Sequence, residues 1–171
     1  MTSMEELAQA LVPESAWDVQ VPGFIDRDGR HPQFVPLSAA VYVALSEGFL
    51  RLDSVAGRSQ LAVRRVDDVE VPEALLDEDE EFSLASFGEP FLADAHRGFR
   101  ITRIRWVTDP GSDAAAGVVR CAEFEFEDAW PVFADPGWHF GIRLEGVGAF
   151  DRWLAREREA GVDLDVASWT R

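Results

Sequence analysis

Alternation of polar and apolar residues is the feature that most constrains how this chain folds. It is clearest from Val118 to Glu127, where Phe124 and Phe126 are interleaved with glutamates. Side chains of a β-strand point alternately to opposite faces, so a period of two predicts one buried and one polar face. The run from Trp138 to Glu145 repeats the pattern, and the run from Phe99 to Thr108 shows it less cleanly. Together the three runs predict an antiparallel meander.

A second meander is predicted nearer the N-terminus. Its strands are expected at Ala40 to Leu45, Phe49 to Val55 and Gln60 to Val66. The first two are joined by Ser46-Glu47-Gly48, whose glycine suits a tight hairpin. An earlier strand is expected from Trp17 to Val21, and Pro22 and Gly23 are predicted to end it.

A short helix is expected near each terminus. Ser3 and Glu6 have the spacing of a capping box, in which each side chain accepts a hydrogen bond from the backbone N–H of the other residue. Near the other end, Phe150 and Trp153 belong to the apolar stripe of a helix that Gly161 is placed to end. The residues that follow alternate again, which predicts an extended and docked C-terminal tail.

Three stretches are expected to lack regular strands. Residues 26–36 and 67–98 are predicted to be mostly loop, with one helical turn at Pro72 to Leu76. The connection Trp130 to Gly137 combines two aromatic residues with a turn signal. Its aromatic side chains would form a recognition surface if exposed, or close one end of the core if buried. Burial is favoured, because large aromatic side chains usually contribute through burial.

These patterns predict a single α+β domain spanning residues 1–171, built mainly of antiparallel β-structure. About seven strands in two meanders are expected, with a short helix near each terminus. The pattern leaves open whether the strands form a barrel or a sandwich.

The charge balance restricts the partners that this surface would attract. The chain carries 32 acidic residues against 16 basic ones, a formal net charge of −16. Such a surface repels nucleic acid and anionic membranes, and it steers basic proteins toward itself. We therefore expect no nucleic-acid or membrane partner. The simpler interpretation is that the charge only keeps the protein in solution.

The composition also predicts a cytoplasmic location. No apolar run approaches the ~20 residues of a membrane helix, and the N-terminus shows no basic segment followed by an apolar one. The single Cys121 has no partner for an internal disulfide, which agrees with a reducing compartment.

The polar face of the central meander is the most distinctive chemistry in the sequence. The candidate ligand-binding residues on it are Arg103, Arg105, Glu123, Glu125, His139 and Arg143. In a closed sheet this face would line a cavity, where arginine would bind an anion and a glutamate or histidine would move protons. In an open sheet the same residues would form solvent-facing ion pairs across the strands, which is the favoured interpretation.

Recognisable catalytic signatures are absent from the sequence. There is no nucleophile elbow, phosphate-binding loop or paired-cysteine zinc spacing, and the three histidines are far apart. We therefore expect no cofactor and no metal, and a non-enzymatic role is favoured over catalysis. Cys121 is a poor candidate nucleophile because neighbouring glutamates would raise its pKa.

The resulting hypothesis is an acidic cytoplasmic module that binds another protein, for example by blocking a basic surface as toxin-neutralising proteins do. The candidate interaction residues are Trp130, Phe133 and the acidic run Asp77, Glu78, Asp79, Glu80 and Glu81. One alternative is a small-ligand-binding barrel or enzyme that uses the arginine and glutamate face. Another is a structural subunit of a larger assembly, with an exposed apolar patch around Trp130 and Phe133.

Overall fold

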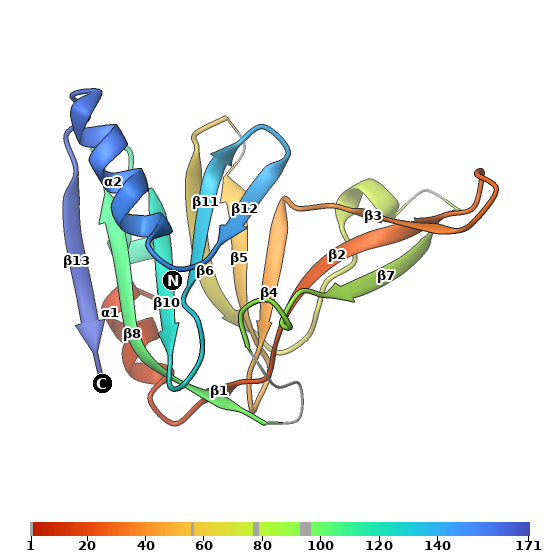
Figure 1. Cartoon of the computed structure of the whole chain (residues 1–171), viewed down its shortest axis with the longest axis horizontal. Helices are drawn as coiled ribbons and strands as arrows, with labels where there is room; N and C mark the ends of the chain where they lie inside the picture. Colours follow the sequence, from red (N-terminus) through yellow and green to blue (C-terminus); the bar gives the residue numbers. More distant parts are fainter. Residues whose placement is uncertain (1, 56, 77–78, 93–96) are drawn as a thin grey trace.

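Two antiparallel sheets, one of which curves into a half-barrel, make up most of the protein (Figure 1). The computed structural model describes residues 2–55, 57–76, 79–92 and 97–171. The strands of the first sheet are β1 (Ser15–Ala16), β8 (Phe99–Thr108), β10 (Cys121–Phe126), β11 (Val132–Trp138), β12 (Gly141–Glu145) and β13 (Asp165–Thr170). They follow the order β1-β8-β10-β11-β12, and β13 also pairs with β8.

The second sheet contains the predicted N-terminal meander. Its strands are β2 (Asp18–Asp26), β3 (Gln33–Pro36), β4 (Ala40–Ala44), β5 (Phe49–Val55), β6 (Gln60–Val66), β7 (Glu81–Ser86) and β9 (Val118–Val119). They follow the order β3-β2-β4-β5-β6-β9, and β7 also pairs with β2. The strands predicted at Phe49 to Val55 and Gln60 to Val66 are confirmed at those bounds. The predicted α+β class with mainly antiparallel strands is also confirmed.

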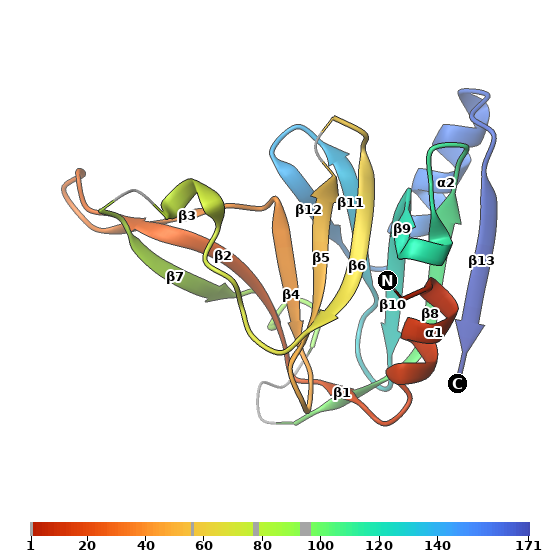
Figure 2. The ribbon, with the colours of Figure 1, turned by 180° about the vertical axis from the view of Figure 1, so that it is seen from behind.

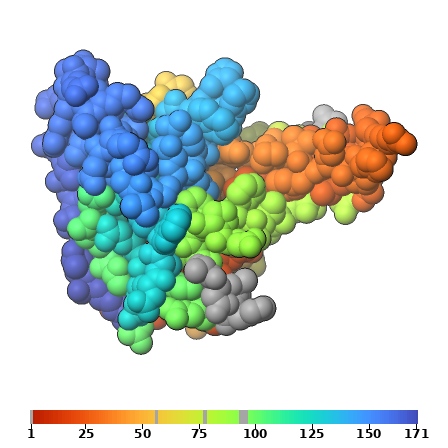
Figure 3. Space-filling view, in the orientation of Figure 1, coloured from red at the N-terminus to blue at the C-terminus, as the bar shows by residue number. Residues whose placement is uncertain are grey.

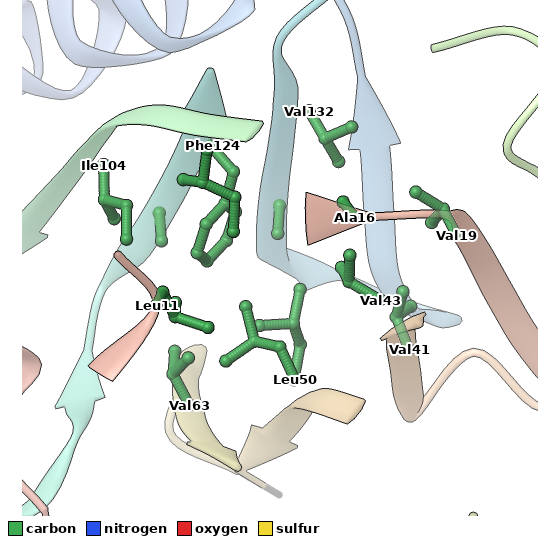
Figure 4. Close-up of a cluster of buried hydrophobic side chains, with 14 of the residues drawn as sticks. Leu11, Ala16, Val19, Val41, Val43, Leu50, Val63, Ile104, Phe124 and Val132 are labelled. Carbon is green, nitrogen blue, oxygen red and sulfur yellow. The ribbon is translucent and has the colours of Figure 1, made fainter. Parts of the chain in front are cut away.

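The core lies between the two sheets (Figure 4). The fully buried side chains include Leu50 from the second sheet and Ile104 and Phe124 from the first. Phe124 and Phe126 lie on the buried face of β10, as the alternation predicts. Burial of this apolar surface, worth ~25 cal/mol per Å², favours the packing of the two sheets against each other.

The chain crosses between the sheets at two short breaks in its strands. Trp17 separates β1 in the first sheet from β2 in the second, and Arg120 separates β9 from β10. The run of residues 118–127 spans the second break, so the sequence predicts one strand where the structure has two. Bends of this kind let one strand serve two packed sheets.

The far half of β2 leaves the body and forms a projecting arm with β3 and β7 (Figures 1 and 2). The prediction that Pro22 and Gly23 end this strand is wrong, because β2 continues through both to Asp26. A side chain at residue 23 would collide with the backbone carbonyl of Val35 and the ring of Phe34. Glycine therefore permits the close approach of β3 instead of ending β2.

The two predicted helices are present. Helix α1 (Met4–Ala10) begins with the predicted capping box, in which Ser3 Oγ accepts from the N–H of Glu6 at 3.1 Å. Helix α2 (Ala149–Glu159) covers the outer face of the first sheet, and Gly161 follows it with φ +78° (Figure 1). The described residues include no helix that is long and apolar enough to cross a membrane. Two single turns, η1 (Glu73–Leu75) and η2 (Ala114–Ala116), complete the helical structure of the described chain.

Three predicted loops contain strands. Strand β3 lies within 26–36, β7 lies within 67–98, and β11 occupies most of 130–137. These strands, with the short β1 and β9, bring the total in the described residues to thirteen, more than the sequence predicts. In β11 the turn signal Pro136-Gly137 lies in a bulge, marked by a register shift between Asp135 and Trp138. Bulges accommodate proline and glycine within a sheet, which explains the error.

Candidate functional site

Cross-strand ion pairs occupy the polar face of the β8–β10 ladder. Register places Arg105 opposite Glu123 and Arg103 opposite Glu125. Arg105 donates from Nε and Nη2 to Oε1 of Glu123 at 2.8 and 2.5 Å. Arg103 donates from Nη2 to Oε1 of Glu125 at 2.6 Å. The four predicted residues on these two strands therefore come together as two charge pairs.

Helix α2 covers the Arg105–Glu123 pair. The Arg105 guanidinium lies 4.0 Å from the centre of the Phe150 ring, and its Nη1 donates to Asp151 at 2.8 Å. Phe150 and Trp153 also form a second core cluster with Phe133 on β11. As a result only 1% of Glu123 remains exposed. Phe150 therefore lies where a ligand of the Arg105–Glu123 pair would have to bind.

The burial of Glu123 has an electrostatic consequence. Burial raises the pKa of Glu123 above its ordinary value, and hydrogen bonds from Arg105 offset part of that rise. A carboxyl group with a raised pKa is also a feature of catalytic acids, but such a group needs access to substrate. Here the carboxylate is held against Arg105 below α2, so the pair is best understood as part of the fold.

The other two predicted site residues lie elsewhere. His139 lies in the turn between β11 and β12, exposed to solvent, and not on a strand as the sequence predicts. Arg143 on β12 pairs with Asp135 at 3.4 Å and with Glu145 at 3.3 Å. The six predicted residues thus divide into four on the β8–β10 ladder and two on the β11–β12 hairpin.

Two exposed aromatic side chains flank His139 and form what we call the aromatic tip, Trp138 and Phe140. Trp138 is 42% exposed and Phe140 is 69% exposed. Their ring centroids lie 5.1 Å apart in an edge-to-face arrangement. The alternation predicts both side chains on the buried face of one strand. That prediction is wrong, because the chain turns between them.

The backbone fixes the aromatic tip in place. Trp138 pairs with Gly141, so the β11–β12 hairpin closes in a tight turn. Gly141 has φ +116°, a conformation that favours glycine, and a side chain there would collide with the Ser38 carbonyl. The N–H of Ile142 donates to that same carbonyl at 2.6 Å. The tip is therefore tied to the β3–β4 connection at the root of the arm.

A hollow on one side of the tip is almost entirely apolar, and we call it the apolar hollow. It has a volume of about 450 Å³ and lies between the β11–β12 hairpin and the arm root, where the surface is notched (Figure 3). Its main walls are Val21, Pro36, Phe87, Phe91, Trp138 and Leu144. Phe87, on the segment after β7, is 39% exposed. Among the described residues that line the apolar hollow, only Arg143 is charged, and it is already paired with Asp135.

A second hollow lies on the Phe140 side of the tip, and we call it the acidic hollow. It has a volume of about 410 Å³ and shares Pro36 and Ser38 with the apolar hollow. The residues that give it chemical character are Tyr42, Arg51, Asp53, Glu70, Glu73 and Phe140. The Tyr42 hydroxyl accepts from the N–H of Glu70 at 3.3 Å, and burial raises the pKa of that phenol.

The predicted interaction residues have different outcomes. Trp130 is 62% exposed, whereas Phe133 is fully buried beneath α2. The prediction of an exposed apolar patch that includes both Trp130 and Phe133 is therefore wrong. In the acidic run, Asp79 and Glu80 are exposed and Glu81 begins β7, where it pairs with Arg27 at 2.5 Å. Asp77 and Glu78 lie outside the described residues.

Cys121 is buried on β10 within the cluster under α2. Burial raises its pKa well above the ordinary value, and Asp135 adds to the effect. A thiol in this state is a packing residue with little thiolate character. The sequence predicts that neighbouring glutamates raise the pKa of Cys121, whereas in the structure burial is the main cause.

Comparison of the chain with protein-family models, with curated proteins and with solved structures finds no significant match.

Proposed function

We propose that this protein is a binding module for another protein and that the aromatic tip, with the apolar hollow beside it, is the recognition surface. The observation that carries the proposal is the exposure of two adjacent aromatic rings at a backbone turn. Leaving such rings in water adds little to folding stability, since the hydrophobic gain requires burial. Exposed apolar patches next to hollows are typical of interaction sites.

The tip also has the properties of an interface anchor. Tryptophan and tyrosine are enriched in binding hot spots, and all aromatic side chains bury large areas at an interface. The backbone hydrogen bond from Ile142 to Ser38 holds the turn against the arm root. Binding therefore costs little conformational entropy in this turn. The adjoining hollow of about 450 Å³ offers space for side chains of the partner.

Net charge supports a basic partner for this surface. At −16 the protein attracts a positively charged protein over a distance set by the salt concentration. Such steering raises the association rate more than it raises the affinity. The proposed role therefore includes the occlusion of a basic surface, as in proteins that neutralise toxins.

A random peptide library displayed on phage tests the proposal. Peptides selected on the wild-type protein should lose about thirtyfold or more in affinity for W138S/F140S, the effect expected of a hot spot worth ~2 kcal/mol. The control variant is W17S, because Trp17 has the same 42% exposure but lines neither hollow. Selected peptides that bind W138S/F140S as tightly as wild type would contradict the proposal.

A further inference from the structure

We infer that the two hollows bind different side chains of one partner segment, with a basic side chain in the acidic hollow and an apolar one in the apolar hollow. This inference rests on the proposed function and specifies the chemistry of the partner. The hollows share Pro36 and Ser38, and the touching rings of Phe140 and Trp138 face one hollow each. A segment that crosses the aromatic tip therefore reaches both.

The charges of the acidic hollow are unevenly paired. Arg51 forms ion pairs with both Asp53 and Glu70. Arg64 approaches the same two carboxylates, at 3.4 and 3.6 Å. Two arginines thus balance two carboxylates, and these side chains offer no charge to a partner. The guanidinium of Arg51 also lies over the ring of Tyr42, 5.5 Å from its centre.

Glu73 is the surplus charge of this hollow. It is exposed, it lies in the single turn η1, and it forms no ion pair with any other described residue. Phe140 lines the same hollow and is 69% exposed, which leaves its ring available to a cation. An ammonium or guanidinium group seated here would meet a carboxylate and an aromatic ring together.

Among its described lining residues, the apolar hollow has no charge comparable to that of Glu73. Of the lining residues in the described ranges, only Arg143 is charged, and Asp135 and Glu145 already pair with it. Phe87 and Trp138 offer ring surface at its opening. An aliphatic or aromatic side chain of the partner enters this hollow at the lowest desolvation cost, because it buries no polar group without a hydrogen bond.

An array of synthetic peptides tests this inference. Each peptide carries one leucine and, at a spacing of one to four residues, one arginine, lysine, glutamine or glutamate. At the best spacing, wild type should bind the arginine and lysine peptides about fivefold or more tightly than the glutamine and glutamate ones. The E73Q variant should reduce that preference below about twofold, and E73K should favour glutamate.

The control for the charge change is E159Q, because Glu159 is exposed at the end of α2 and lines neither hollow. Its preference should equal that of wild type. If peptides bind at the aromatic tip but E73Q keeps the full preference, the inference is wrong and the proposed function stands. If no peptide binds wild type better than W138S/F140S, the proposed function fails and the inference fails with it.

Discussion

Aromatic and charged side chains meet at two places in this protein, beneath helix α2 and at the aromatic tip. Beneath α2 the Phe150 ring lies against Arg105, and 1% of Glu123 is exposed. At the tip, Phe140 is 69% exposed, and the acidic hollow beside it contains Glu73, which forms no ion pair within the described part of the chain. Beneath α2 the charged and aromatic groups contact one another. At the tip, the Phe140 ring and the Glu73 carboxylate remain available to another molecule.

The difference lies in what covers each site. The chain itself supplies the cover for Glu123, because α2 follows β12 and lies across the ladder (Figure 1). No described element lies over Trp138 and Phe140 in the same way. Residue types alone therefore do not separate a structural cluster from a binding surface. The element that packs over them does.

The R105A variant should have the largest effect on stability. It removes the cation that pairs with buried Glu123 and the group that packs on Phe150. Breaking a buried pair on one side costs about 3 kcal/mol or more, which chemical denaturation can measure. Replacement of both partners, as R105M/E123L, should recover much of that loss, since no buried charge is then left without a partner and Asp151 is exposed to solvent. A loss below ~0.5 kcal/mol for R105A would contradict a structural role.

The W138S/F140S variant should show the reverse behaviour. Because Phe140 is 69% exposed and Trp138 is 42% exposed, the free energy of unfolding should change by less than about 1 kcal/mol. Affinity for peptides selected on wild type should fall by about thirtyfold or more. Thermal melting and peptide titration of the same sample check both parts. A stability loss like that of R105A would place the tip among the structural residues.

The R103A variant sharpens the comparison within the β8–β10 ladder. The Arg103–Glu125 pair has the same register geometry as Arg105–Glu123, but its side chains are 37% and 32% exposed. Solvent screening limits such a pair to about 1 kcal/mol or less. We expect R103A to destabilise the protein by less than a third of the effect of R105A in parallel denaturation experiments. Equal losses would show that burial is not the deciding factor.

The smallest effect concerns the pH dependence of stability. Burial raises the pKa of Glu123 above 4.5, so the folded state binds this proton more tightly than the unfolded state. Its contribution to stability is complete below pH 4.5 and falls as the pH rises through the interval above that value. E123Q lacks this titration, so its stability relative to wild type should rise with pH across that interval.

Urea denaturation of both proteins at about pH 4 to 7 measures this difference, and effects of the remaining carboxylates cancel in the comparison. A relative stability that stays flat or falls with pH would show that Arg105, rather than burial, controls the carboxyl group.

The sequence predicts the strands of the core well because their alternation directly reflects burial. Phe124 and Phe126 face the core as expected, and β8 has the predicted bounds. The predictions fail where a glycine or proline serves a close contact instead of a turn. Gly23 admits the backbone of β3, and Pro136-Gly137 lie in a bulge, so a strand boundary is misread at both places.

The sites are harder to predict than the strands. The pairing of Arg105 with Glu123 follows from strand register, but the cover that α2 provides is a long-range contact that alternation does not encode. The alternation predicts a buried face for the aromatic tip, because Trp138 and Phe140 continue the period of two. The signal that could reveal the turn is Gly141, whose φ of +116° a glycine adopts readily.

The most direct test is the affinity of one wild-type-selected peptide for three proteins: wild type, R103A and W138S/F140S. If the aromatic tip is the recognition surface and the ladder is structural, R103A should bind as wild type does. W138S/F140S should bind about thirtyfold or more weakly. The account is contradicted if the peptide keeps its affinity for W138S/F140S, or if it loses affinity for R103A.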